Sequence, residues 1–66
     1  MKKFYVTFGM GSPFKNGYIV VHAEDEGKAR EKTFEALGAK WAFIYDEEEF
    51  LPQIERFGLE KKGEIE

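Results

Sequence analysis

Residues 3–8, KFYVTF, place Phe4, Val6 and Phe8 on one face of an extended chain and Tyr5 on the other. A period of two in aromatic and β-branched side chains is typical of a β-strand. This alternating run fits the central place in a small sheet. We therefore expect residues 3–8 to form the strand around which the other elements are arranged.

The rest of the chain predicts a strand, a helix, a further strand and a short helix. Asp25 is a candidate N-cap, and Gly38 can adopt the left-handed conformation that ends a helix. Pro52 suits a first helical position, and Gly58 can stop the helix that follows it. The four elements are expected at residues 18–23, 25–37, 41–45 and 52–57.

The order strand–strand–helix–strand constrains the topology. A crossover through a helix is right-handed and makes the two strands that it joins parallel. The simplest arrangement puts the first strand in the middle, antiparallel to both neighbours, in the order 2-1-3. We expect an α+β fold with a three-stranded mixed sheet, one main helix on one face and a short C-terminal helix. The chain, residues 1–66, is expected to be a single domain whose tail 59–66 either adds a weak edge strand or stays mobile.

Composition excludes several classes of site. Thirteen acidic and ten basic side chains give a formal net charge of −3, which argues against nucleic acid as a partner. Cysteine is absent and His22 is the only histidine, so thiolate sites and sites of several imidazoles are excluded. A carboxylate-only metal site remains open, but we predict no metal and no cofactor.

The chain also lacks the marks of a membrane protein, an exported protein or an enzyme. No apolar run approaches the ~20 residues of a membrane span, and no signal peptide opens the sequence. Ser12 and His22 alone are not a catalytic signature. We expect a soluble, cytoplasmic protein that is not an enzyme and has no catalytic residues.

The loop Gly9–Gly17 is a candidate anion site. Glycines such as Gly11 let backbone amides approach an anion closely, Ser12 offers a hydroxyl, and Lys15 can neutralise a phosphate. The spacing matches neither the P-loop nor the dinucleotide fingerprint. The alternative is a long hairpin connection whose glycines serve only the backbone.

A second candidate site is the aromatic face of the sheet that the short helix is too small to cover. An open aromatic face on so small a domain usually meets a second copy or a ligand, so we expect a homo-oligomer. If Tyr5, Trp41 and Tyr45 share this face, they can stack a base or a sugar. The alternative is that these rings pack in the core or in a dimer interface.

The acidic run is a candidate surface for a basic protein partner. It consists of four consecutive residues, Asp46, Glu47, Glu48 and Glu49. One alternative is a solvated turn, because Asp46 and Glu49 have the spacing of a capping box. Another is a cation site or an acid–base pair, although adjacent carboxylates rarely converge on one point.

Three motifs resemble a family of small proteins encoded by phages and prophages. They are YVTFG at Tyr5–Gly9, the pattern A-R-x-x-x-F-x-x-x-G from Ala29 to Gly38, and KWAFIYDEEEFLPQIERFGL at Lys40–Leu59. The motifs span nearly the whole chain. The family has no settled activity, so the resemblance implies no catalytic residues; it implies a bacterial host-cell setting and an accessory role.

Small phage accessory proteins often inhibit host antiviral defence by binding a protein or sequestering a nucleotide signal. We therefore expect a phage accessory protein that acts by binding, with a host defence protein or a small phosphorylated ligand as partner. The alternative is a structural or regulatory phage component with no small-molecule ligand.

Overall fold

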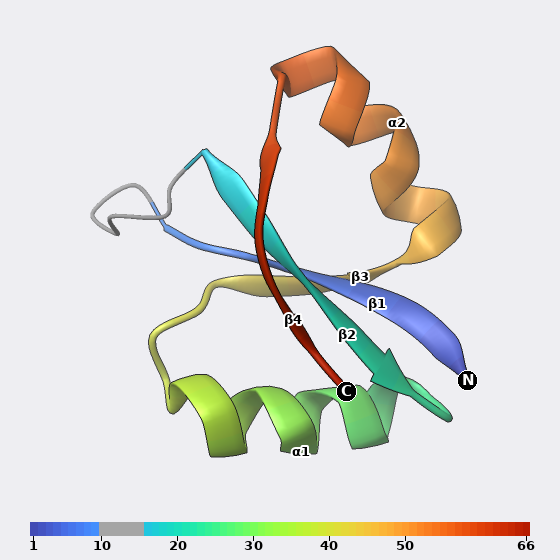
Figure 1. The fold of residues 1–66 in the computed structure, drawn as a ribbon, viewed down its shortest axis with the longest axis vertical. Coiled ribbons are helices and arrows are strands. Elements are labelled where there is room, and N and C mark those ends of the chain that lie inside the picture. Colours follow the sequence, from blue (N-terminus) through green and yellow to red (C-terminus); the bar gives the residue numbers. More distant parts are fainter. Residues whose placement is uncertain (10–15) are drawn as a thin grey trace.

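The computed structural model describes residues 1–9 and 16–66, which form an α+β structure with a mixed sheet (Figure 1). The helices and strands in these residues are β1 (Lys2–Thr7), β2 (Gly17–Ala23), α1 (Glu26–Leu37), β3 (Phe43–Asp46), α2 (Glu47–Phe57) and β4 (Glu60–Ile65). The α+β class is as the sequence predicts. Within the described residues, no helix is long and apolar enough to cross a bilayer.

The sheet has four strands in the order β3-β1-β2-β4, so the expected three-stranded sheet of order 2-1-3 is wrong in its strand number and its extent. β1 lies between β2 and β3 and is antiparallel to both. The tail forms β4, which runs parallel to β2 at the edge (Figure 1). This strand forms because α2 returns the chain to the edge of β2, whose backbone groups would otherwise face water.

Helix α1 matches its prediction closely because local signals determine both of its ends. Asp25 is the N-cap, and its carboxylate accepts a hydrogen bond from the backbone N–H of Lys28 at 2.8 Å. Gly38 ends the helix with φ of 63°, a conformation that favours glycine.

Strand β3 and helix α2 both differ from their predicted limits. β3 spans 43–46 rather than 41–45, and α2 begins at Glu47 rather than at Pro52. Asp46 causes the earlier start, because its carboxylate caps α2 by accepting from the backbone N–H of Glu49 at 2.8 Å. Three glutamates in the first turn also interact favourably with the helix dipole. Pro52 consequently lies inside the helix.

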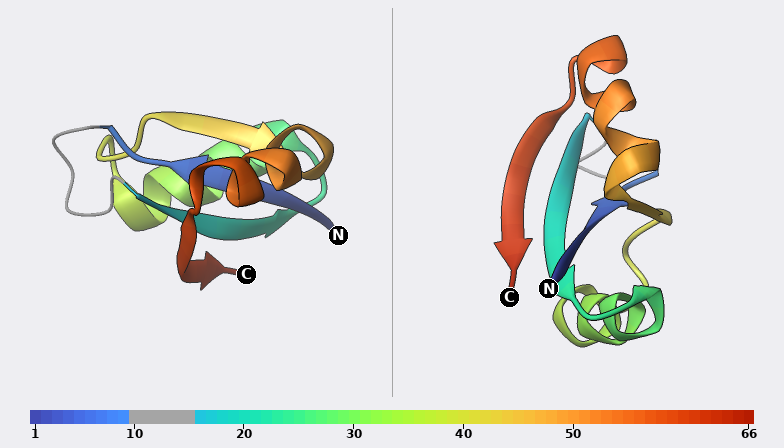
Figure 2. Two further views of the ribbon diagram at one scale, coloured as in Figure 1. Left: turned by 90° about the horizontal axis from the view of Figure 1, so that it is seen from above. Right: turned by 90° about the vertical axis from the view of Figure 1, so that its right-hand side faces the viewer.

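The two faces of the sheet have separate hydrophobic layers. Side chains alternate along a strand, so neighbouring residues of β1 enter different layers. The layer under α1 includes Phe4, Val6 and Val21, and the layer under α2 is built from Tyr5, Val20 and Phe50. Figure 2 shows the two helices on opposite sides of the sheet.

The expectation of an open aromatic face is wrong, because α2 covers that face. Phe50 of α2 is only 1% exposed, and its ring stacks on Tyr5 at 5.1 Å and on Tyr45 at 5.5 Å between ring centroids. Tyr5 itself is 5% exposed. The earlier start of α2 supplies this cover. Self-association stays a prediction, but the open aromatic face that motivates it is covered by α2.

Candidate protein-binding site

The aromatic residues predicted to bind a ligand lie in two different layers. Tyr5 and Tyr45 are partners across β1 and β3 and pack under α2. Trp41 packs against the core under α1, with its ring centroid 5.3 Å from that of Phe34. Its indole N–H donates to the carbonyl of Gly38 at 3.0 Å. The structure therefore does not bring the three rings together as one stacking surface.

The residues predicted to bind an anion, Gly11, Ser12 and Lys15, lie outside the described residues. The described C-terminal end of their loop is tied to β4. There the carbonyl of Asn16 accepts a hydrogen bond from the backbone N–H of Glu60 at 3.1 Å.

The acidic run contributes to a hollow of about 590 Å³ where three elements begin. The start of β1 forms one wall, and the starts of α1 and α2 form the others. We call this feature the acidic hollow. It is lined by Met1, Lys2, Lys3, Phe4, Asp25, Glu26, Asp46, Glu47 and Glu48. Glu49, the fourth residue of the predicted site, is not among the lining residues.

The acidic hollow concentrates the negative charge of the protein. Five carboxylates and two lysines line it, a formal side-chain charge of −3. The whole chain has the same net charge of −3, so the remaining side chains balance one another. Two of the carboxylates, those of Asp25 and Asp46, are helix N-caps. The excess of carboxylates over lysines at the hollow therefore favours a cationic group there over an anionic one.

The other three carboxylates differ in how firmly they are held. Glu47 accepts a hydrogen bond from the hydroxyl of Tyr5 at 3.0 Å, and Glu26 lies 3.7 Å from the Nε of Arg30. Glu48 is exposed and, within residues 1–9 and 16–66, makes no side-chain hydrogen bond or ion pair. Glu48 is therefore the lining carboxylate most available to a partner.

The sequence predicts one of the two acidic segments of this site, Asp46 to Glu48. It indicates Asp25 and Glu26 only as the start of a helix. The two acidic segments are far apart in the chain, and no motif links them. They meet because each follows a strand that ends at the same side of the sheet, β2 before α1 and β3 before α2.

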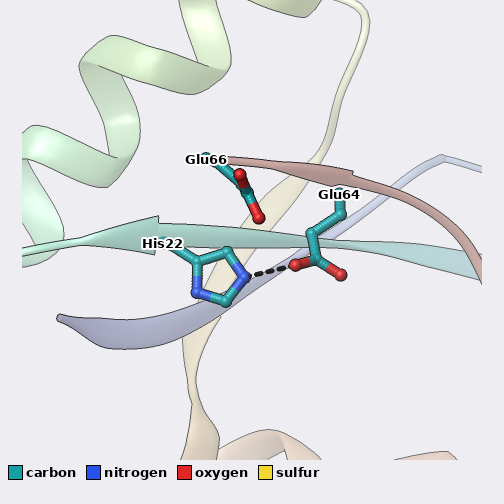
Figure 3. Close-up of side chains that lie close together, drawn as sticks. All are labelled: His22, Glu64 and Glu66. Carbon is teal, nitrogen blue, oxygen red and sulfur yellow. Dashed lines mark hydrogen bonds and ion pairs between the residues drawn. The ribbon is translucent and has the colours of Figure 1, made fainter.

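A second polar cluster lies on neighbouring strands, away from the lining of the hollow. Figure 3 shows His22 of β2 beside Glu64 of β4, with Glu66 just beyond the end of β4. The Nε2 of His22 lies 2.6 Å from the Oε2 of Glu64. Because a carboxylate only accepts, Nε2 is the donor in this contact.

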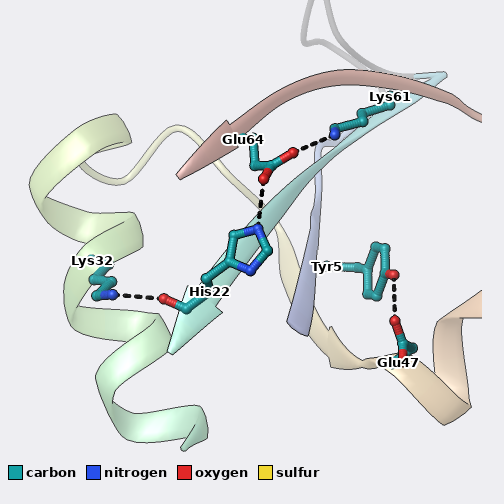
Figure 4. Close-up of polar contacts among 6 residues, drawn as sticks. All are labelled: Tyr5, His22, Lys32, Glu47, Lys61 and Glu64. Carbon is teal, nitrogen blue, oxygen red and sulfur yellow. Dashed lines mark hydrogen bonds and ion pairs between the residues drawn. The ribbon is translucent and has the colours of Figure 1, made fainter. Parts of the chain in front are cut away.

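The contacts of this cluster extend to Lys61 and to helix α1 (Figure 4). Lys61 donates to the other carboxylate oxygen of Glu64. The hydrogen bond from Lys61, and next that from His22, hold the pKa of Glu64 below its usual value. Lys32 of α1 donates to the backbone carbonyl of His22 at 2.6 Å, which ties the end of β2 to the helix.

Tyr5 joins β1 to the first turn of α2 through its hydroxyl group (Figure 4). Burial, and next the hydrogen bond to Glu47, raise the pKa of this phenol from its usual value to about 12. Tyr5 is therefore neutral at physiological pH and donates its proton to a charged acceptor. Tyr5 therefore links β1 to α2 and is not exposed for stacking on a ligand.

Comparisons with protein-family models, with curated proteins and with solved structures found no match to this chain.

Proposed function

We propose that this chain is a non-enzymatic binding protein that holds a basic surface of a protein partner in the acidic hollow. The observation that carries the proposal is the meeting of two acidic helix starts, which gathers five carboxylates around one concave surface. The resemblance to phage and prophage proteins implies that the partner is found in a bacterial host cell. We propose a host protein, with an antiviral defence protein as the specific case.

The hollow suits a lysine- or arginine-rich surface for two physical reasons. Complementary charge speeds encounter and suppresses wrong partners, since like charges brought together cost several kcal/mol. A concave site also lets several carboxylates contact one cationic side chain. Glu48 and Glu26 are the lining residues best placed for this, because both are exposed at the first turn of a helix.

A small phosphorylated ligand is the weaker alternative. Its predicted anion-binding residues, Gly11, Ser12 and Lys15, lie outside the described residues, and the aromatic side chains proposed to stack a base lie in two separate layers. The other alternative, a structural or regulatory phage component, assigns the hollow no partner.

Charge reversal of Glu48 tests the proposal. Glu48→Lys puts a cation in the hollow and spares the Tyr5–Glu47 contact, whereas Glu55→Lys makes the same charge change on α2 outside the lining. We expect phage plating on defence-carrying hosts to rise when the wild-type protein is expressed and to stay raised with Glu55→Lys. With Glu48→Lys we expect the affinity for the partner to fall at least about tenfold, the effect of about 1.4 kcal/mol of lost binding, and the gain in plating to fall with it.

Hosts without the defence system and a thermal melt of each variant serve as controls. A lysine in the first turn opposes the helix dipole by only about 0.3–1 kcal/mol, so both variants should remain folded. The proposal is wrong if the wild-type protein leaves plating unchanged on every defended host tested, which is what the structural alternative predicts. Equal activity of the two variants would exclude the hollow as the binding site.

A further inference from the structure

We propose that His22, Glu64 and Glu66 form a binding site for a divalent transition-metal ion of the Zn²⁺ class. One ligand atom from each residue lies within 4.8 Å of the other two (Figure 3). None of the three residues lines the acidic hollow. The inference is therefore separate from the proposed protein-binding function and does not depend on it.

The backbone of the sheet brings the three side chains to one face. β2 and β4 are parallel, with Val20 beside Glu64 and Val21 beside Ile65. Ile65 packs against the core under α1, so Glu64 and Glu66, one residue to either side of it, take the opposite face. His22 comes two residues after Val20 and shares this face. The paired strands β2 and β4 thus supply His22 and Glu64, and Glu66 directly follows β4.

The donor set selects the class of metal. One imidazole nitrogen and two carboxylate oxygens suit Zn²⁺ and its first-row neighbours, whereas Ca²⁺ and Mg²⁺ prefer oxygen ligands alone. Three protein ligands leave a fourth position for water, as in open zinc sites. The imidazole also distinguishes this cluster from an ordinary group of surface acids.

The present geometry needs only side-chain adjustment to accept the ion. Ligand atoms at bonds of about 2.1 Å in a tetrahedron lie about 3.4 Å apart. The contact of 2.6 Å between His22 and Glu64 would open slightly, and Glu66 would move inward. The side chains of His22 and Glu64 are 22% and 35% exposed, so the ion can reach them from solvent.

Metal binding needs the lone pair of Nε2, so the proton that His22 now donates to Glu64 leaves that nitrogen. The imidazole then ligates the ion as the neutral ring, with its proton on Nδ1. Lys61 contacts the other oxygen of Glu64, so that ion pair is compatible with metal at Oε2. The sequence does not predict such a site, because it contains a single histidine and no motif links His22 to the carboxylates of the tail.

The test is a calorimetric Zn²⁺ titration of the untagged chain, since a polyhistidine tag would bind the ion itself. We expect one Zn²⁺ per chain. Loss of a residue that only hydrogen-bonds to a metal ligand lowers metal affinity about 10–100-fold. Since His22 is itself a ligand, His22→Gln should lower the affinity for Zn²⁺ at least about 100-fold. Glu64→Gln and Glu66→Gln should also weaken binding, and Glu60→Gln, on the same strand but outside the cluster, should not.

An NMR readout separates loss of a ligand from loss of the fold. His22 is the only histidine, so every imidazole signal belongs to it, and Zn²⁺ should shift the Nε2 resonance of the wild-type chain. The inference is overturned if Zn²⁺ leaves that resonance in place, or if His22→Gln, shown to be folded by its amide spectrum, binds Zn²⁺ as well as wild type. Equal affinity for Ca²⁺ and Zn²⁺ would also overturn it.

Discussion

Tyr5 shows how much the role of one residue depends on what covers it. Its position in an alternating strand placed it correctly on the face away from Phe4 and Val6, but no local signal said that Phe50 would close over it. The closure turns an exposed ring into a buried phenol whose hydroxyl donates to Glu47 at 3.0 Å.

This buried phenol predicts a loss of stability at high pH. The pKa of Tyr5 is about 12 in the folded protein, against about 10 for a tyrosine in an unfolded chain. Between these values the unfolded state releases its proton first, so the free energy of unfolding falls as pH rises. The contribution is fully present below about pH 10, is lost through about pH 12 and amounts to about 3 kcal/mol.

Comparison of wild type with Tyr5→Phe in urea, at pH values from about 8 to about 12, isolates this effect, since all other titrations are shared. We expect the stability difference between the two proteins to shrink as the pH rises. A difference that stays constant with pH would contradict the assignment.

At the scale of elements, the sequence allows the tail to be either an edge strand or mobile, and pairing with β2 makes it the strand β4. The polar residues of 60–65 lack a strong strand signal, yet their backbone pairs with β2 in parallel register. Helix α2 shows the opposite case. Its capping residue, Asp46, has the spacing of a capping box with Glu49, whereas Pro52 predicts a later helix start. Burial of Phe50 and the cap at Asp46 together favour the longer helix.

Two glycines test the pairing of β2 with β4. A Cβ at Gly17 would lie 2.3 Å from the Cγ of Lys62 and 3.0 Å from the carbonyl oxygen of Glu60, so Gly17→Ala must move the Lys62 side chain and crowds the backbone of β4. We expect Gly17→Ala to lower the free energy of unfolding by about 1–3 kcal/mol.

Gly63→Ala is the matched control, because its Cβ would meet only Ile19, at an ordinary 3.8 Å. It should be neutral or stabilising by up to about 1 kcal/mol. Urea unfolding and hydrogen exchange of the β4 amides measure both variants. Equal behaviour of the two alanine variants would mean that β4 does not pack as described.

At the scale of the whole molecule, two helices close the two faces of one sheet, and Phe50 is central to the second closure. Phe50→Ala should lower the free energy of unfolding by about 3–5 kcal/mol, as for other buried phenylalanines. It should also uncover the layer of Tyr5, Val20 and Tyr45, which we expect to increase the binding of a hydrophobic dye.

Phe57→Ala, on the same helix at a residue that is 62% exposed, is the control and should change stability by no more than about 0.5 kcal/mol. Light scattering on both variants also bears on self-association. Dimers that form only with Phe50→Ala would mean that α2 normally prevents that contact. Similar losses of stability in the two variants would refute the described α2 layer.

What the sequence determined by itself was local. The alternation in residues 3–8 and 18–23, the cap at Asp25 and the glycine at 38 act within a few residues, so strands β1 and β2 and the limits of α1 could be predicted. Composition also shows the excess of acidic over basic side chains. These signals need no knowledge of distant parts of the chain.

Tertiary structure decided whatever joins distant segments: the cover of α2 over Tyr5, the place of β4 beside β2, the meeting of Asp25 with Asp46, and the gathering of His22 with Glu64 and Glu66. Each of these depends on which sheet edge and which apolar face remain to be covered once the local elements have formed. That choice follows from the burial and backbone pairing of the whole chain, and residue periodicity does not encode it.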